Sequence, residues 1–360
     1  MTYAPTRYLA WARQFYGQIP YDLATSGVPI VTHAELGAPD DPVDPKAFAR
    51  LRAAIARYND VPEADTIAAL GTSHALWLAY ATLLSPGDDV LVEDPAYEPL
   101  LRSAEGLGAR AVRFARPEAE GFALDPAKVE RALTTRTRIV SVTNHHNPSG
   151  LRADDERLRA IARVCAARGA ILLVDEVYAP FDALVDASGV FRGSARKLGP
   201  NVVAVASLTK CYGLGPHRIG WMLGPPDVIA RADDVLTATV GVLPTPHASF
   251  GAHAFAHIDS LATRARDRLR GRRERVATWM SARPDLRWSA PPDGTFGFAT
   301  STRAGDLLPL LEAGARDLGV LVAAGTFFGM PNGFRLSWAT LAGAELDEAL
   351  ARLGTLLPGA

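Results

Sequence analysis

Short apolar runs alternate with amphipathic stretches along the first two thirds of the chain. The apolar runs predict six strands, with residues 218–223 as a candidate seventh, at residues 66–70, 89–93, 109–114, 138–143, 170–175 and 201–207. Helical periodicity predicts intervening helices at residues 45–58, 73–84, 97–107, 126–133 and 153–168. Such alternation is typical of crossover units, which build parallel sheets. The sequence therefore predicts an α/β fold with a mostly parallel, doubly wound sheet.

The pattern changes beyond about residue 244. Residues 248–280 have long helical periodicity, a Pro-Pro-Asp-Gly turn follows at 291–294, and a smaller set of strands and helices leads to a last helix. This mixture is typical of an α+β unit. We expect a large domain over residues 45–245 and a smaller α+β domain formed by residues 1–44 together with residues 246–360.

Composition argues against some classes of binding partner for this chain. The 360-residue chain carries 38 basic and 39 acidic residues, a formal net charge of −1, so neither nucleic acid nor an acidic membrane is an expected partner.

Cys165 and Cys211 are the only cysteines and predict neither a disulfide framework nor a thiolate site. His253 and His257 have metal-ligand spacing without an evident third ligand, so no metal site is predicted. No apolar run approaches the ~20 residues that cross a bilayer, and the first residues lack signal-peptide features, so we expect a cytoplasmic protein.

Polar side chains gather where predicted strands end. Ser73, Asp94, Asn147, Asp175 and Lys210 lie at or just past such ends. A doubly wound sheet binds its ligands at the carboxyl ends of its strands. We therefore expect several of these side chains to share one ligand site.

Lys210 has the most informative surroundings. A hydroxyl, Ser207, stands three residues before it, and Arg218 stands eight residues after it. A primary amine forms a reversible imine with an aldehyde, and an arginine suits a nearby phosphate. A lysine taken alone would more often be an exposed surface residue. The motif around Lys210 favours a site.

Two further motifs precede this lysine in the chain, Asn-Pro-Ser-Gly at residues 147–150 and Asp-Glu-Val-Tyr at residues 175–178. An Asn-Pro pair alone is usually a turn, and a lone aspartate often just ends a strand or caps a helix. In this order and spacing, the three motifs resemble those of the fold type I enzymes that use pyridoxal 5′-phosphate (PLP), the class I and II aminotransferases. The resemblance covers about residues 45–339.

The resemblance implies roles around the cofactor ring. Lys210 would form a Schiff base with the aldehyde and carry the proton at the substrate's α-carbon. Asp175 would pair with the protonated ring nitrogen, which suits a carboxylate at the end of an apolar strand. Asn147 and Tyr178 would donate hydrogen bonds to the phenolic oxygen, and Tyr97 would stack on the ring face.

The resemblance also implies sites for the phosphate and the substrate. A Gly-Thr-Ser-His turn at residues 71–74 ends a strand and opens a helix, where backbone N–H groups can hold an anion. The predicted phosphate ligands are Thr72, Ser73, His74, Ser207 and Arg218. Arg335, within a Gly-Phe-Arg-Leu-Ser motif, would bind the substrate's α-carboxylate as a two-pronged donor, with Gly27 and Asn147 beside the same substrate.

The chain departs from the family pattern in two places. Residues 41–46 contain no tyrosine of the kind that relatives donate across a dimer to the neighbour's phosphate. Residues 239–247 contain no arginine of the kind that dicarboxylate-specific relatives present, so a second carboxylate on the substrate is not favoured. The segment 22–36 resembles that of capreomycidine synthase and related enzymes of specialised metabolism.

We therefore predict a homodimeric, PLP-dependent aminotransferase that moves an amino group between an α-amino acid and a 2-oxo acid. The alternative within enzymes is a PLP-dependent lyase or β/γ-replacement enzyme, including a cyclase of the capreomycidine-synthase type, because the same residues serve any α-carbanion. The competing class is a non-catalytic sensor with this fold. The predicted Lys, Asp and Arg set disfavours that class.

Overall fold

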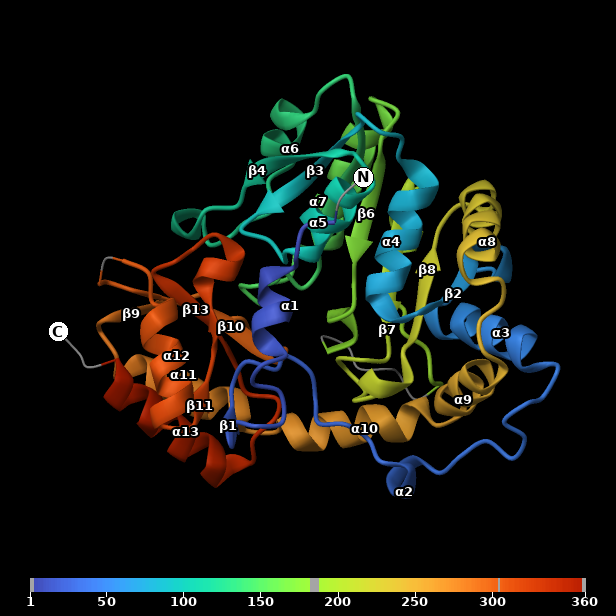
Figure 1. Ribbon diagram of the computed structural model, residues 1–360. Helices are drawn as coiled ribbons and strands as arrows, with labels where there is room; N and C mark the ends of the chain where they lie inside the picture. Colours follow the sequence, from blue (N-terminus) through green and yellow to red (C-terminus); the bar gives the residue numbers. More distant parts are fainter. Residues whose placement is uncertain (1–2, 182–187, 304, 358–360) are drawn as a thin grey trace.

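The computed structural model describes residues 3–181, 188–303 and 305–357. Its largest sheet has seven strands in the order β2-β8-β7-β6-β5-β3-β4 (Figure 1). These strands are β2 (Thr66–Leu70), β3 (Asp89–Asp94), β4 (Arg110–Ala115), β5 (Thr137–Thr143), β6 (Ile171–Asp175), β7 (Val202–Ser207) and β8 (Ile219–Leu223). Only β8 runs antiparallel to its neighbours, β2 and β7, within this sheet. The predicted mostly parallel α/β fold is confirmed, and the candidate seventh strand belongs to it.

Helices cover both faces of this sheet. The helices are α3 (Ala47–Asn59), α4 (Gly71–Leu83), α5 (Pro99–Gly106), α6 (Pro126–Ala132), α7 (Asp155–Ala166) and α8 (Pro226–Val240). On β6, Leu172 and Val174 pack into a cluster with α3, α6 and α7, whereas Leu173 packs into a second cluster with α4, α5 and α8. Successive strand side chains point to opposite faces, so a sheet covered on both faces needs continuous apolar strands. This explains the unbroken apolar runs of the sequence.

The C-terminal part contains helices and a small antiparallel sheet. The expected helical stretch 248–280 forms three helices, α9 (Thr245–Ala256), α10 (Ile258–Leu269) and α11 (Arg272–Ser281). Gly271, with φ +71°, separates the last two in a left-handed conformation that glycine adopts without strain. The small sheet has the order β12-β13-β10-β9. Its strands and the remaining helices are β9 (Leu286–Trp288), β10 (Phe296–Ser301), β12 (Ala323–Ala324), β13 (Gly333–Ser337), α12 (Leu308–Asp317) and α13 (Gly343–Leu356).

The N-terminal segment joins the two parts. Helix α1 (Arg7–Ala12) buries Tyr8 and Trp11 in the same apolar cluster as the small sheet, and Figure 1 shows α1 between the two sheets. The short β1 (Tyr21–Asp22) pairs with β11 (Val320–Leu321). Beyond it, Val28 and Val31 enter the core of the large sheet, and α2 (His33–Leu36) follows. The chain thus crosses from one part to the other before the large sheet begins.

The division into residues 45–245 and residues 1–44 plus 246–360 stays a prediction. Helix α9 packs along α3, and Phe250 and Ile258 belong to the core cluster of the large sheet. Residues 182–187 of the expected large domain, and residues 1–2, 304 and 358–360 of the expected small one, lie outside the described residues. Within the part that is described, no helix is long and apolar enough to cross a membrane.

Candidate active site

A cavity of about 500 Å³, which we call the central cavity, opens where the carboxyl ends of the large sheet face α1 and β13. Strands β6 and β7 end at Asp175 and Ser207, which both line the cavity. Parallel strands end at one edge, so side chains more than a hundred residues apart in sequence meet there. Its lining residues are Tyr8, Leu9, Arg13, Tyr16, Ser26, Thr72, Ser73, Leu76, Tyr97, Pro99, Asn147, Asp175, Val177, Tyr178, Ser207, Thr209, Lys210, Arg218 and Arg335.

Lys210 stands three residues beyond β7 with its side chain on the central cavity. Burial, and to a smaller extent the positive charge of Arg335, lower its pKa to about 8, while Asp175 opposes the shift. Its carbonyl oxygen accepts a hydrogen bond from Val28 N–H at 2.9 Å. A lowered pKa increases the fraction of neutral amine near pH 7, and the neutral amine is the nucleophile.

Gly27 lies in close contact with Lys210. A Cβ added at Gly27 would lie 3.1 Å from the Cα of Lys210 and 3.2 Å from its Cδ. Gly27 does not itself line the central cavity. The predicted position of Gly27 beside the substrate stays a prediction. In the structure Gly27 contacts Lys210.

Asp175 is buried at the end of β6. Burial is the largest influence on this carboxyl and raises its pKa to about 7, although the Val177 N–H donates to Oδ1 at 3.1 Å and opposes the shift. Among the described residues, no side chain donates a hydrogen bond to Asp175. A buried carboxylate is costly without a cationic partner. Asp175 is therefore suited to a cationic group bound in the cavity.

Arg335 is buried on β13 and anchored by hydrogen bonds. Nη1 donates to Asn147 Oδ1 at 2.8 Å, and Nη2 donates to the Tyr8 hydroxyl and the Ala24 carbonyl, both at 2.8 Å. Its Nε is buried without a partner in the described protein. A fixed guanidinium with donor capacity left over suits a carboxylate.

Asn147 and Tyr178 line the central cavity from the ends of neighbouring strands. Because the side-chain oxygen Oδ1 of Asn147 accepts a hydrogen bond from Arg335, the side-chain nitrogen Nδ2 is left to donate elsewhere. The Tyr178 hydroxyl lies 2.7 Å from Ser26 Oγ. Tyr97 is half-buried on the same cavity and makes an edge contact with Tyr8 at a centroid distance of 6.3 Å.

Donors for an anion gather at the N-terminus of α4. Thr72 Oγ1 donates to Ser207 Oγ at 2.8 Å, and Ser73 and Arg218 line the same end of the cavity. Gly71 has φ +79°, and a Cβ there would lie 2.3 Å from Arg218 Nη2. Only glycine therefore lets this guanidinium approach the helix terminus. N–H groups, hydroxyls and a guanidinium together suit a phosphate.

His74 takes a different position from its neighbours. Its Nδ1 accepts a hydrogen bond from the Leu70 N–H at 3.0 Å, and its side chain does not line the central cavity. Burial lowers its pKa, which favours the neutral ring that such an acceptor requires. The predicted contact between His74 and the cofactor stays a prediction.

Comparison with known proteins agrees with these motifs. Residues 43–353 match the family described as aminotransferase class I and II. The chain belongs to that family. It is 32% identical to capreomycidine synthase of Streptomyces vinaceus, over 95% of this chain and 91% of that protein. It is 26% identical to an aspartate aminotransferase of Geobacillus stearothermophilus, over 82% and 76% of the two chains. A PLP-dependent aminotransferase structure from Streptococcus suis has the same fold, with a TM-score of 0.87 at 22% identity over 99% of this chain and 98% of that one.

Several residues of this family member's cavity escaped sequence reasoning. Tyr8, Leu9, Arg13 and Tyr16 reach the cavity from α1 and the turns that follow it. The sequence offers no motif for them, because their place depends on how α1 docks between the two sheets. Ser26 also lines the cavity. Its position next to Gly27, a predicted substrate-binding residue, was the only feature of the sequence that pointed to it.

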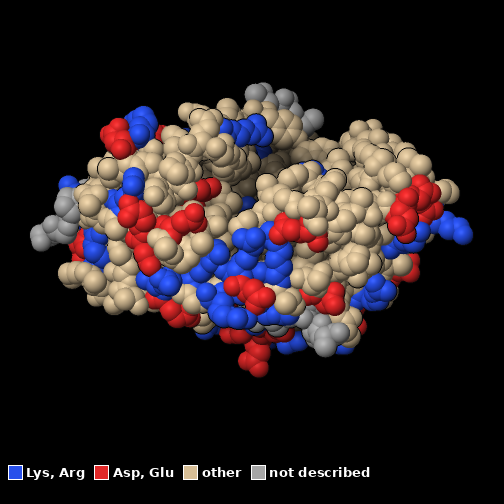
Figure 2. All heavy atoms as spheres, turned by 90° about the horizontal axis from the view of Figure 1, so that it is seen from below, with Lys and Arg blue, Asp and Glu red and all other residues tan. Residues whose placement is uncertain are grey.

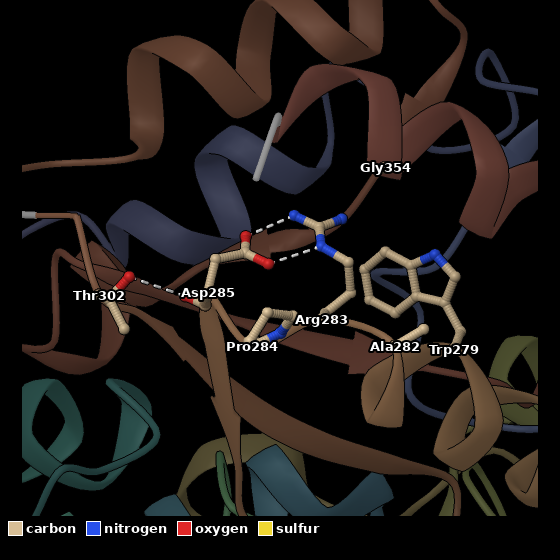
Figure 3. Close-up of a pocket in the computed structure, with 7 residues that line it drawn as sticks. All are labelled: Trp279, Ala282, Arg283, Pro284, Asp285, Thr302 and Gly354. Atoms are coloured by element: carbon tan, nitrogen blue, oxygen red, sulfur yellow. Dashed lines mark hydrogen bonds and ion pairs between the residues drawn. The ribbon is translucent and has the colours of Figure 1, made fainter. Parts of the chain in front are cut away.

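A second hollow of about 420 Å³ lies near the ends of α11 and α13 (Figure 3). Arg283 donates to both oxygens of Asp285, at 2.8 and 2.5 Å, and its guanidinium lies 5.1 Å from the Trp279 ring centroid. The charges of Arg283 and Asp285 therefore neutralise each other within this hollow. The central cavity, with Lys210, Asp175 and Arg335, is the better candidate for chemistry.

A run of arginines covers the end of α10 and the start of α11, at residues 264–275. Figure 2 shows basic side chains near the middle of the lower face, with acidic ones beside them. Arg264 pairs with Glu35 at 2.9 Å, and Arg275 pairs with Asp347. These pairs compensate part of the positive charge of this run. Among the described residues, no group of three or more His, Cys, Asp or Glu side chains is arranged to hold a metal ion.

Proposed function

We propose that the chain is a PLP-dependent aminotransferase that moves an amino group between an α-amino acid and a 2-oxo acid. The observation that carries the proposal is the meeting of Lys210, Asp175 and Arg335 on one cavity. An amine with a lowered pKa, a buried carboxylate that needs a cation and an anchored guanidinium supply the three functions that amino-group transfer requires.

The residues present fit the cofactor. Asp175, without a side-chain donor, would accept the protonated ring nitrogen, and its raised pKa would fall beside that cation. Asn147 and Tyr178 would donate to the phenolic oxygen, and Tyr97 would lie against the ring. The phosphate would be held by Thr72, Ser73, Ser207 and Arg218. When bound, PLP supplies an electron sink for the negative charge left at the substrate's α-carbon.

The protein's own groups then determine which bond reacts. Arg335 binds the substrate's α-carboxylate through its free donor capacity and orients the α-carbon toward Lys210. Lys210 would hold the aldehyde of the cofactor between turnovers and, as a free amine, would carry the proton at the substrate's α-carbon. In the net reaction the α-amino acid would exchange its amino group for the oxo group of a second substrate, so that the first leaves as an oxo acid and the second as an amino acid.

We further propose that the protein is a cytoplasmic homodimer. Its two cysteines, Cys165 and Cys211, are both buried and are not joined in a disulfide, which suits a reducing compartment. The exposed apolar side chains Val43 (65%) and Val242 (76%) would be covered if a second copy packed over them.

A second candidate function is a PLP-dependent lyase, replacement enzyme or cyclase. The observation that favours it is the 32% identity to capreomycidine synthase over 95% of the chain. The residues that stabilise charge at the α-carbon serve either outcome, since elimination at the side chain begins with the same proton removal.

A half-reaction distinguishes the two functions. PLP-loaded protein is mixed with single L-amino acids in the absence of any oxo acid, and absorbance is followed together with products. We expect the yellow form to convert stoichiometrically to the amine form, with one equivalent of oxo acid released. Sustained release of ammonia without that conversion would favour a lyase. An unchanged spectrum with every amino acid would contradict both functions.

A further inference from the structure

Arg13 lines the central cavity from the turns that extend α1. Leu9, Arg13 and Tyr16 all line it, at helical spacings i, i+4 and i+7. The backbone continues helically here, since Arg13 N–H donates to the Leu9 carbonyl at 3.1 Å and Tyr16 N–H to the Ala12 carbonyl at 3.0 Å. Residues at such spacings share one face of a helix. The face of α1 toward the cavity therefore carries a cation.

The other cations of the cavity have tasks in the proposed function. Lys210 serves the reacting aldehyde and proton, Arg218 the phosphate, and Arg335 the α-carboxylate. Arg13 has no ion-pair partner among the described residues and no assigned task. The cavity is lined by four cationic side chains and one carboxylate, Asp175, which would be neutralised by the ring nitrogen. Among the described residues of this lining, Arg13 is the cationic side chain to which the proposed function assigns no partner.

We propose that Arg13 binds an acidic group on the substrate's side chain, so that the preferred substrates are amino acids with a second carboxylate and the corresponding oxo acids. This inference rests on the proposed function, because Arg335 must hold the first carboxylate. It revises the expectation from residues 239–247, which lack an arginine. The required cation comes from a different element, at the N-terminus.

The same geometry disfavours a basic substrate side chain. Among the described residues that line the cavity, only Asp175 carries a carboxylate, and it lies at the end of β6. A substrate ammonium or guanidinium would meet Arg13 without a counter-charge, and like charges disfavour binding. A carboxylate would instead gain a charge-assisted, two-pronged contact.

Binding of a non-reacting dicarboxylate tests Arg13 apart from turnover. Maleate, with two carboxylates, and isovalerate, with one, are titrated against PLP-loaded protein and followed by the change in absorbance. We expect Arg13→Gln to weaken maleate binding roughly five- to tenfold, since Arg13 is exposed and partly screened by solvent, and to change isovalerate binding less than about twofold. Arg7→Gln is the matched control, because Arg7 is also exposed on α1 but does not line the cavity. An equal loss for both ligands, or no loss, would overturn the role of Arg13.

The half-reaction supplies the second test. Wild-type protein is expected to react at lower concentrations of aspartate or glutamate than of asparagine or glutamine, and Arg13→Gln is expected to reduce this preference by the same roughly five- to tenfold factor. Wild-type preference for the amides, or a preference for the acids that Arg13→Gln leaves intact, would overturn the inference. Failure of every amino acid to react would instead contradict the proposed function, whatever the maleate titration shows.

Discussion

The floor and the outer wall of the central cavity are built differently. The floor consists of side chains at the carboxyl ends of β6 and β7, such as Asp175 and Lys210, where the register of buried strands fixes each position. The wall consists of α1 and its following turns, where Arg13 and Tyr16 are exposed. The floor carries the side chains that the proposed reaction needs. The wall carries side chains suited to distinguishing one substrate side chain from another. Catalysis and selectivity should therefore respond to different substitutions.

The largest effect is expected at the floor, from Asp175→Asn. Without a carboxylate, the ring nitrogen of the bound cofactor loses its partner, so turnover should fall about 10²–10³-fold. Asp94→Asn is the control, because Asp94 ends strand β3 of the same sheet but pairs with Arg113 outside the cavity. Steady-state rates of both variants measure the difference. Equal rates for Asp175→Asn and wild type would remove Asp175 from the site.

The same substitution should stabilise the protein without cofactor at alkaline pH. The folded pKa of Asp175, about 7, lies above the ordinary value for an aspartate, so the folded state binds this proton more tightly than the unfolded state does. Its contribution to stability is therefore present below pH ~4 and is lost as pH rises toward about 7. Thermal unfolding of the cofactor-free proteins at pH 8 should show a higher Tm for Asp175→Asn than for wild type. A lower Tm for Asp175→Asn than for wild type would mean that the Asp175 carboxylate has a stabilising partner in the folded protein.

A smaller loss is expected where floor and wall meet, at Arg335→Lys. Lysine keeps the charge but cannot reach Asn147, Tyr8 and the substrate carboxylate as a planar fork, so kcat/KM should fall roughly 10²-fold. Arg352→Lys, whose arginine pairs with Glu348 on α13 and does not line the cavity, should change kcat/KM little. A loss confined to kcat with KM unchanged would argue against a binding role for Arg335.

The link between the N-terminal segment and the floor gives a further, milder effect. Gly27→Ala adds a Cβ 3.1 Å from the Lys210 Cα, and such overpacking costs about 1–3 kcal/mol. We expect a lower Tm together with about tenfold slower turnover. Gly224→Ala, where the nearest atom would lie 3.4 Å from the added Cβ, is the matched control. If Gly27→Ala behaves like the control, the segment does not position Lys210.

The smallest change concerns pH. Because the pKa of Lys210 is lowered to about 8, the neutral amine forms at lower pH than in a free lysine. The rate at which cofactor-free protein recombines with PLP should rise with pH and level off just above pH 8. A rate that continues to rise toward pH 10 would show that the floor does not perturb this amine.

The floor was predictable from the sequence, and the wall was not. Apolar runs located the strands of the large sheet to within a residue or so, and Asp175 and Lys210 followed because ligands bind at strand ends. The side chain of His74 turns to the Leu70 N–H, a local choice of partner that no motif records. Tyr8 and Arg13 depend on the docking of α1 against residues some three hundred positions away, such as Arg335 and Phe328. Such long-range packing leaves no periodic signal in a single sequence.

The central claim is that the amine of Lys210 is the group that holds the cofactor. It is tested most directly by treating PLP-loaded protein with borohydride, digesting it and locating the modified peptide by mass. We predict a single modified peptide, which contains Lys210, and no modification at the exposed Lys46 or the exposed Lys197. A cofactor label on another lysine, or none at all in protein that is active before treatment, would contradict the account.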